Sequence, residues 1–319
     1  MATIICGIDV SSDSLDARIG PEGPFASFAN NSKGIARLAA FCRAHHVELV
    51  AMEATGGYEQ QPFAQLWAEG VPVAILNPRA VRKFAEAMGF LEKTDRIDCG
   101  VIAHFAAVKK IKPCPPASAD QQRLKALVTR LRQLTDLQTA QRNQRRLVAD
   151  ATVLAMFTEI LAVVAAQIRA LENEIAKLIA SDPLWQKLDQ AFRSIKGVAD
   201  RTVARLMADM PEIGTLSNKA VSKLAGLAPL ACDSGKKQGK RSVRGGRRGV
   251  RDILFVVASV VRRCHPDFAA FHQRLSQAGK TKKVIRVALA HKLLVRLNAK
   301  AREVRNQFAA AQACYAVAG

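Results

Sequence analysis

The expected fold is decided by the segment Ile4-Ile5-Cys6-Gly7-Ile8-Asp9-Val10-Ser11-Ser12-Asp13. Its apolar run ends at the carboxylate of Asp9, and a polar turn follows. The run predicts a buried β-strand over residues 3–10, and Ser11-Ser12-Asp13 joins it to a second strand over residues 15–19. Residues 24–30 are a third expected strand. A chain that starts with three strands and then alternates helix and strand is typical of an α/β domain with a mixed sheet.

This alternation follows directly along the chain. Thr55-Gly56-Gly57 breaks one strand, and Asn77-Pro78 starts a helix after another. The expected elements are a helix over 33–45, a strand over 47–53, a helix over 58–69, a strand over 71–76, and helices over 79–88 and 95–109. Pro113, Pro115 and Pro116 then mark a boundary, so we expect a first domain over residues 1–115.

The pattern changes beyond these prolines. Leucines at positions 124, 127, 131 and 134 recur at spacings of three and four, and a second apolar run spans residues 168–178. We expect two long helices in a connector over residues 116–183, which form either an antiparallel hairpin or a dimerising coiled coil. Residues 184–319 are expected to form a mainly α-helical domain.

One turn in this last part has two interpretations. Ser194-Ile195-Lys196-Gly197-Val198, followed by a helix over residues 200–208, resembles half of a helix-hairpin-helix motif. In that motif a glycine turn presents backbone N–H groups to a DNA phosphate. Ala199 stands where a second glycine is expected, so an ordinary helix start remains the alternative.

The charge of the chain indicates a polyanionic partner. Its 319 residues include 48 Lys and Arg against 27 Asp and Glu, which gives a formal net charge of +21 and a pI near 10.2. This balance favours nucleic acid over a membrane surface. With 5% aromatic residues, contacts to the phosphate backbone are expected more than base stacking. The candidate nucleic-acid-binding residues lie close together in the sequence: Lys236, Lys237, Lys240, Arg241, Arg244, Arg247, Arg248 and Arg251.

The cysteines and the hydropathy exclude other classes. Seven cysteines are scattered without a CxxC pair, which argues against zinc-ribbon and thioredoxin-type sites. Isolated cysteines and the lack of a signal peptide fit a reducing, bacterial cytoplasm. We also expect no membrane partner, because no apolar run is judged to reach the roughly 18 residues that span a bilayer.

Four acids occupy positions where an active-site carboxylate can be presented. Asp9 and Glu53 each end an expected strand, and Asp95 and Asp98 share one face of an expected helix. Carboxylates that meet at strand ends are suitable ligands for Mg²⁺, which assists phosphodiester chemistry. Each acid taken singly is also explained as a turn, cap or surface residue, so only the set predicts a metal site.

These motifs together carry a family resemblance. Gly7-Ile8-Asp9-Val10-Ser11, Met52-Glu53-Ala54-Thr55-Gly56-Gly57-Tyr58 and Lys93-Thr94-Asp95-Arg96-Ile97-Asp98 resemble the DEDD-type insertion-sequence transposases. Farther on, Leu224-Ala225-Gly226-Leu227-Ala228-Pro229, Asp233-Ser234-Gly235-Lys236 and Gly245-Gly246-Arg247-Arg248-Gly249-Val250-Arg251 resemble the second domain of the same family. The resemblance covers essentially the whole chain.

The resemblance implies a fold, a reaction and partners. The first domain is expected to be RNase H-like and similar to the RuvC Holliday-junction resolvase. The chain is expected to be a recombinase that a structured non-coding bridge RNA guides to donor and target DNA. Asp9, Glu53 and Asp98 are implied as direct Mg²⁺ ligands, with Asp95 beside them, and Ser234 as the nucleophile that forms a phosphoserine link to DNA. A homo-oligomer, a tetramer of two dimers, is implied as well.

Chemistry alone gives Ser234 partial support. A serine hydroxyl needs a proton acceptor or a metal-polarised target, and no histidine is adjacent in sequence, so a Ser-His-Asp triad has little support. Metal assistance from the acids is the better activation, within one chain or between subunits. A flexible polar loop with a basic face is the plain alternative, and the spacing of Gly235 and Gly239 is not that of a P-loop.

Three other functions remain as alternatives. A RuvC-like Mg²⁺-dependent nuclease or junction resolvase would use the same acids with water as nucleophile. A sugar kinase or actin-like ATPase would need a glycine-rich phosphate loop, which Ser11-Ser12-Asp13-Ser14-Leu15 lacks. A non-enzymatic RNA-binding protein would use the basic residues without the acids.

Overall fold

The computed structural model describes residues 3–90, 95–235, 239 and 241–318, without the side chains of residues 95–96 and 313–318. The predicted nucleic-acid-binding residues Lys236, Lys237 and Lys240 lie outside the described residues. The chain divides into two compact units, Met1–Ala117 and Ser118–Gly319. The predicted first boundary, at residue 115, lies close to this division, and the predicted separation at residue 183 stays a prediction.

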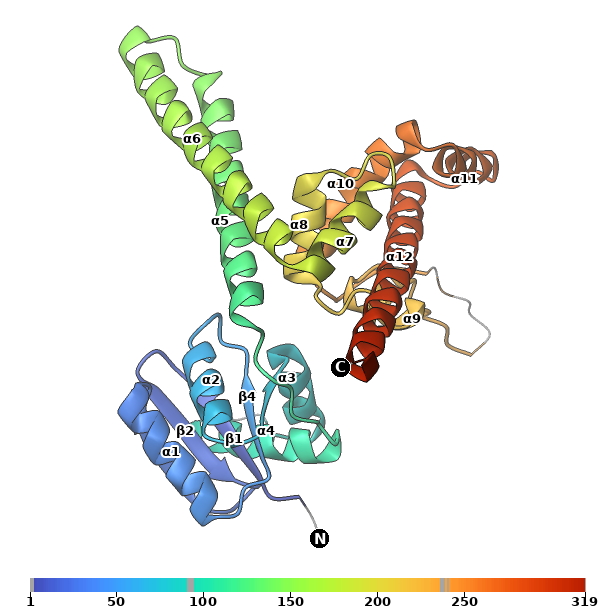
Figure 1. The fold of residues 1–319 in the computed structure, drawn as a ribbon. Coiled ribbons are helices and arrows are strands. Elements are labelled where there is room, and N and C mark those ends of the chain that lie inside the picture. Colours follow the sequence, from blue (N-terminus) through green and yellow to red (C-terminus); the bar gives the residue numbers. More distant parts are fainter. Residues whose placement is uncertain (1–2, 91–94, 236–238, 240, 319) are drawn as a thin grey trace. The chain divides into compact units, whose positions relative to one another are not determined.

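The first unit is built on one mixed five-stranded sheet (Figure 1). Its strands are β1 (Ile5–Val10), β2 (Ser14–Ile19), β3 (Phe25–Ala29), β4 (Leu49–Glu53) and β5 (Val73–Leu76), in the order β3-β2-β1-β4-β5. The first three strands are antiparallel neighbours, whereas β4 runs parallel to β1 and β5 parallel to β4. This arrangement confirms the expected α/β mixed sheet and the RNase H-like fold class.

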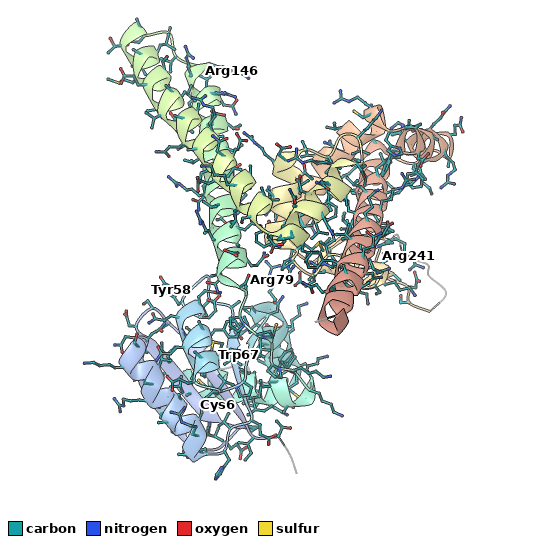
Figure 2. All side chains as sticks on the ribbon, viewed as in Figure 1. Cys6, Tyr58, Trp67, Arg79, Arg146 and Arg241 are labelled. Atoms are coloured by element: carbon teal, nitrogen blue, oxygen red, sulfur yellow. The ribbon has the colours of Figure 1, made fainter. Side chains whose placement is uncertain are left out.

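Helices cover both faces of the sheet. They are α1 (Ser32–Ala44), α2 (Gln60–Ala68), α3 (Pro78–Ala87) and α4 (Asp95–Val108). On one face, Ile8 of β1 packs with Leu38 of α1 and Leu66 of α2, and Cys6 lies inside the same layer (Figure 2). On the other face, Ala51 of β4 belongs to a separate core with residues of α3 and α4.

Local signals start these helices where the sequence predicts. The side chain of Asn31 accepts a hydrogen bond from the backbone N–H of Gly34 and caps α1. Asn77 caps α3 in the same way, and Pro78 occupies its first turn, where a missing N–H costs no hydrogen bond. These caps place α3 directly after β5 on the face that α4 also covers.

The second unit is helical. Its elements are α5 (Ala119–Arg145), α6 (Ala151–Ser181), α7 (Pro183–Arg193), α8 (Asp200–Asp209), α9 (Asn218–Leu224), α10 (Arg248–Cys264), α11 (Pro266–Gln277) and α12 (Lys282–Ala318). Helices α5 and α6 lie side by side as an antiparallel hairpin, and Arg146 marks the end where the hairpin turns (Figures 1 and 2). Leu124 of α5 and Ile168 of α6 share one core with Phe192 of α7 and Leu254 of α10.

The sequence-based statement about membrane spans needs correction. Helix α6 is long and apolar enough to cross a membrane by length and composition alone, with a mean hydropathy of 1.9 in its most apolar window. Only 11% of that window is buried. The spacing of apolar residues predicted an amphipathic connector helix here. In the structure, exposed apolar side chains such as Met156 and Val163 extend the apolar surface of α6 beyond the face that packs on α5. One such helix is weak evidence for a membrane span.

A buried amide holds α12 to the segment before α9. Asn298 is fully buried, and its Oδ1 accepts a hydrogen bond of 2.9 Å from the backbone N–H of Gly214. Its Nδ2 donates to the carbonyl oxygen of Leu216 at 3.0 Å and to Oδ1 of Asn218 at 2.9 Å. All these groups would lose hydrogen-bond partners if the amide were removed.

We therefore expect Asn298→Leu to lower the free energy of unfolding by about 1–3 kcal/mol for each buried group that it leaves without a partner. Urea unfolding of the full chain measures the change. The matched control is Asn306→Leu, because Asn306 lies exposed on the same helix and should change stability by less than about 0.5 kcal/mol. Equal effects of the two substitutions would show that the amide network contributes nothing specific.

Candidate active site

Asp9 and Glu53 lie close together because they occupy matching positions in the pleat of two neighbouring parallel strands, β1 and β4. Ile8 of β1 is paired with Met52 of β4, and both side chains are buried in the core beside α1 and α2. Successive side chains of a strand point to opposite faces. The next residues, Asp9 and Glu53, therefore lie at the same level of the sheet on the face that α3 and α4 cover.

Helix α4 adds Asp98 to the same place. Asp9, Glu53 and Asp98 line one cavity of about 300 Å³. The remaining lining residues come from α3 and α4: Pro78, Val81, Arg82, Ala85, Val101 and Ile102. Asp95 begins α4, one turn before Asp98, and its side chain lies outside the described part of the structure. Three of the four predicted acids are thus brought to one cavity from three elements.

Gly7 makes this arrangement sterically feasible. A Cβ atom on Gly7 would overlap the carbonyl oxygen of Cys99 and would lie 2.7 Å from the backbone nitrogen of Ala103. Because any side chain at this position would push α4 away from β1, glycine lets the helix lie directly on the strand. Cys99 follows Asp98, so the same contact sets how far Asp98 stands from Asp9.

The Cys99 thiol lies in the field of the neighbouring acids. Burial raises the pKa of Cys99 to about 12, although a hydrogen bond from the backbone of Asp9 opposes the rise. The negative charges of Asp9, Asp16 and Asp98 raise the pKa further. The Cys99 Sγ also donates to the carbonyl oxygen of Asp16 at 2.9 Å.

Sequence reasoning missed two charged residues near this site. Asp16 of β2 is the direct strand partner of Asp9, which places a further carboxylate on the neighbouring strand. Arg82 of α3 lines the cavity and forms a 3.3 Å ion pair with Glu86. The hairpin turn at residues 11–13 fixes the register that faces Asp16 with Asp9, and this signal was readable in the sequence. Nothing local in the sequence distinguishes Arg82 from other helix-surface arginines.

The loop after β4 is fixed by a buried carboxylate. Glu59 accepts hydrogen bonds from the backbone N–H of Gly57 at 2.8 Å, and from the backbone and hydroxyl of Thr55 at 3.1 and 3.2 Å. Burial alone would raise the pKa of Glu59, but hydrogen bonds from its own backbone, Gln60, Gly57 and Thr55 outweigh burial and lower it. The ionised Glu59 therefore orders the loop that directly follows Glu53.

The donor set fits a hard divalent cation. Carboxylate oxygens are the ligands that Mg²⁺ prefers, and this cavity collects three of them beside apolar walls. Among the side chains that the structure describes, no group of three Asp, Glu, His or Cys is already close enough to hold a metal ion. The acids thus offer suitable ligands, and a bound cation would have to draw them closer together.

Ser234 lies in the second unit, on a loop whose base is tied. The backbones of Leu230 and Ser242 exchange hydrogen bonds of 2.8 and 3.3 Å. Inside this bridge, Asp233 accepts from the backbone N–H of Gly239 at 3.0 Å and from Arg241 at 2.7 Å. Ser234 itself is exposed. The loop therefore presents a serine hydroxyl to solvent from an anchored base.

The described members of the predicted basic set differ in their contacts. Arg247 forms two 2.6 Å hydrogen bonds to Glu212 and one of 2.8 Å to the carbonyl oxygen of Asp209. Arg251 donates to the carbonyl oxygen of Gly245 at 2.8 Å. These two arginines hold the segment before α10 in place, which is a structural role that the sequence pattern did not separate from nucleic-acid binding.

The other arginines are more available to a ligand. Arg244 is exposed, and Arg248 forms an exposed 3.4 Å ion pair with Asp252. Exposed pairs of this kind contribute little to stability and exchange readily for another anion. Arg241 is also exposed, and its pair with Asp233 places it beside Ser234.

The glycine turn before α8 has a packing explanation. Gly197 adopts a φ of +99°, and an added Cβ would lie 3.1 Å from the Cα of Val261 in α10. A glycine at this position therefore allows the turn to lie against α10. This contact accounts for the residue without a DNA phosphate, and the predicted phosphate contact stays a prediction.

Comparison with known proteins assigns both halves of the chain to one group. A family model described as a transposase, of the DEDD type of IS110, matches residues 6–153. A second model, described as the transposase IS116/IS110/IS902 family, matches residues 189–273. The matched ranges include Asp9, Glu53 and Asp98 in the first case and Ser234 in the second.

Individual relatives agree with these models. The pilin gene-inverting proteins of Moraxella lacunata and Moraxella bovis are each 27% identical to this chain over 304 residues, covering 92% of this chain and 94% of theirs. The insertion element IS110 uncharacterized 43.6 kDa protein of Streptomyces coelicolor is 31% identical over 117 residues, covering 36% and 28%. A solved structure of Thermus thermophilus RuvC aligns with 35% of this chain and 99% of its own, at 16% identity and a TM-score of 0.25.

The contact at Gly7 gives a prediction for the acid cavity. Gly7→Ala should destabilise the chain by about 1–3 kcal/mol because it overpacks the β1–α4 contact, and Gly7→Val should cost more. Urea unfolding measures both. Thr3→Val, at an exposed position ahead of β1, is the matched control and should stay within about 0.5 kcal/mol. If Gly7→Val lowered the free energy of unfolding no more than Gly7→Ala, the close packing of β1 against α4 would be contradicted.

The tied base of the serine loop gives a second prediction. Asp233→Ala removes the acceptor for Gly239 and Arg241, so trypsin should cleave within residues 236–241 faster than in the parent chain. Asp252→Ala, which removes only the exposed pair with Arg248, is the control and should leave the rate unchanged. Peptide mapping of timed digests gives the rates, and identical cleavage in both variants would argue against Asp233 as the anchor.

Proposed function

The chain belongs to the DEDD-type transposases of the IS116/IS110/IS902 family, and from that premise we propose that it is a bridge-RNA-guided DNA recombinase that forms a phosphoserine intermediate. As a transposase it is a DNA-rearranging enzyme that acts on DNA. The single observation that carries the finer proposal is the cavity that Asp9, Glu53 and Asp98 line together. It supplies the carboxylates, and the exposed Ser234 supplies a nucleophile.

The acids form the cation-binding part of the proposal. Asp9, Glu53 and Asp98 would hold Mg²⁺, with Asp95 beside them. When bound, Mg²⁺ supplies charge neutralisation at a phosphodiester and assists the ionisation of a nucleophile. Glu59 keeps the loop behind Glu53 ordered, and Gly7 keeps Asp98 close to β1. These residues thereby limit the rearrangement that ligand binding would require of the carboxylates.

The serine forms the covalent part. In the proposed step, the Oγ of Ser234 gives its proton to water and attacks the phosphorus of a DNA phosphodiester. The bond from phosphorus to the leaving sugar oxygen breaks, and that oxygen takes up a proton from water to become a hydroxyl. A hydroxyl of another DNA end then displaces Ser234 from phosphorus. The phosphoserine ester conserves the phosphodiester linkage, so strands can be exchanged without an external energy source. Arg241, beside Ser234, is suited to bind the phosphate charge.

The guide and the assembly complete the proposal. Sequence choice would lie in base pairing to a structured RNA, with the protein contacting backbones through exposed arginines such as Arg244 and Arg248. A tetramer of two dimers would coordinate the strand exchanges. Exposed apolar residues near the end of the α5–α6 hairpin support such an assembly, because a partner subunit would cover them: Leu137, Leu147, Val153, Met156, Ile160 and Val163.

A RuvC-like nuclease with water as nucleophile is the second candidate. The observation that favours it is that the acid cavity is formed wholly by the first unit, without Ser234. The two candidates differ in their product, because hydrolysis leaves no covalent link to the protein.

Mutation and trapping distinguish these candidates. Ser234→Ala and Asp9→Asn should each abolish recombination of element-end DNA in the presence of guide RNA and Mg²⁺, while binding of the nucleic acids stays largely intact. Ser276→Ala, an exposed serine on α11, is the matched control and should recombine normally. Denaturation after reaction should reveal a DNA adduct that maps to Ser234. Recombination by Ser234→Ala, or free cut ends without an adduct, would overturn the nucleophile assignment.

A further inference from the structure

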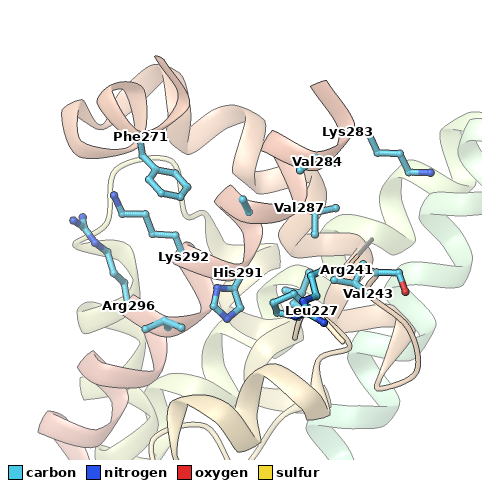
Figure 3. A pocket seen from close by; sticks show the side chains of 14 residues that line it. Leu227, Arg241, Val243, Phe271, Lys283, Val284, Val287, His291, Lys292 and Arg296 are labelled. Atoms are coloured by element: carbon cyan, nitrogen blue, oxygen red, sulfur yellow. The ribbon is translucent and has the colours of Figure 1, made fainter. Parts of the chain in front are cut away.

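A cavity in the second unit lies beside the serine loop and has no role in the function proposed above. It has a volume of about 760 Å³ and lies between the segment around Leu227 and Val243, helix α11 and helix α12 (Figure 3). Its volume is within the range of roughly 300–1,000 Å³ that ligand pockets have. Apolar side chains form its wall: Leu227, Val243, Phe271, Val284, Val287 and Val295.

The edge of this cavity is cationic. The described residues that line it include Arg241, Lys283, Lys292 and Arg296, and none of them is an acid. Arg241 and Arg296 are each ion-paired with an acid outside the lining, Asp233 and Asp267. Figure 3 shows Lys292 and Arg296 on one side of the view and Lys283 on the other, with His291 between Lys292 and Leu227. An apolar pocket edged by positive charge suits a ligand with one flat apolar part and flanking negative charges.

The cavity is continuous with the base of the serine loop. Arg241, Ser242 and Val243 line it, and Ser242 is the residue that pairs with Leu230 to close the loop. Arg241 also pairs with Asp233, the neighbour of Ser234. A ligand that occupies the cavity would therefore lie next to the segment that presents the proposed nucleophile.

We propose that this cavity receives one unstacked nucleobase of the DNA strand next to the phosphodiester that Ser234 attacks. The inference rests on the proposed function in one respect: the strand is identified as DNA beside the scissile phosphate because Ser234 is the proposed nucleophile. The apolar wall would cover the faces of a base, and the lysines and arginines at the edge would bind the phosphates on either side. The Lys292 ammonium lies 4.5 Å from the ring centre of Phe271, so a base that stacks on this ring would displace it toward a phosphate. Removing one base from the stack would also expose the neighbouring backbone to the serine loop.

His291 adds a polar group to this mainly apolar wall. Its Nε2 is 3.0 Å from the hydroxyl of Ser222, which fixes the orientation of the ring. Burial lowers the pKa of His291, which favours the neutral ring. Its second nitrogen, Nδ1, is then the atom of this residue that can form a hydrogen bond with a base edge. A neutral ring suits an uncharged base better than a charged ring would.

Photocrosslinking of the full chain tests the proposal. The probe is a short single-stranded DNA that carries 5-iododeoxyuridine, used in the Ser234→Ala background so that no strand is cut. The DNA should crosslink to residues of the cavity, with Phe271 and His291 as the expected positions. Ala288→Trp fills the cavity from α12 and should lower the yield by about tenfold, the order of effect of losing one stacked base.

Controls separate the cavity from general DNA binding. Val256→Trp adds the same side chain at an exposed position of α10 and should leave the yield unchanged. Val287→Asp places a carboxylate in the cavity and should also lower the crosslink yield. Thermal unfolding of each variant shows whether Ala288→Trp alters folding, and Val287→Asp then carries the test. Crosslinks that persist in the Ala288→Trp and Val287→Asp variants, or that map only outside the cavity, overturn the proposal.

Two further arms exclude other occupants. If the same oligonucleotide made as RNA with 5-iodouridine crosslinks in the cavity and the DNA does not, the cavity serves RNA and the proposal is wrong. If Ala288→Trp changes only the sedimentation of the protein and not the DNA crosslink, the cavity is a subunit contact and the proposal is again wrong. Failure of the Ser234 assignment is separate, because recombination by Ser234→Ala would not alter the crosslink in the cavity.

Discussion

The close contact between β1 and α4 is the constraint on which the acid cavity depends. Gly7 has no side chain, and the carbonyl oxygen of Cys99 occupies the space where a Cβ would be. The helix is therefore held at backbone distance from the strand, and Asp98, the residue before Cys99, is brought to the face where Asp9 emerges. Gly7, which has no functional side chain, thus determines the spacing of the Asp9 and Asp98 carboxylates. The parallel pairing of β1 and β4 adds Glu53, so backbone geometry accounts for all three carboxylates.

The serine loop depends on a different kind of restraint. Residues 231–235, 241 and 242 are exposed, and polar contacts define the base of the loop: the backbone bridge from Leu230 to Ser242 and the bonds of Asp233 to Gly239 and Arg241. Farther along, Arg247 is held by Glu212, whose pKa is raised by burial but lowered overall by the bonds from Arg247. Charged residues in this segment therefore divide into those that shape it and those that remain exposed. An exposed serine on a tied loop can approach a large ligand without losing its position.

Much of the fold was readable from local patterns. Apolar runs that end in turns located β1, β2 and β4, and the Asn77-Pro78 pair located the start of α3. The positions of the acids on their elements also followed, because strand ends and the spacing of Asp95 and Asp98 are properties of single elements. The cavity contains Asp9, Glu53 and Asp98, and the place of the Asp95 side chain in it stays a prediction. What could not be predicted depends on contacts between distant segments. Arg247 differs from Arg248 through its bonds to Glu212 and to the carbonyl oxygen of Asp209, which lie in a distant part of the sequence.

The cavity beside the serine loop also could not be predicted from local sequence patterns. Its residues come from three stretches around 227–243, 271 and 283–296, and none of these stretches has a recognisable motif for a ligand pocket. On α12, Val284 is 53% exposed and lines the cavity together with Val287 and Val295. An apolar stripe that the fold leaves uncovered, next to cations and a reactive loop, is costly in water unless a ligand covers it. In a chain with a net charge of +21 that acts on DNA, a nucleotide is the ligand that satisfies both the apolar wall and the cationic edge.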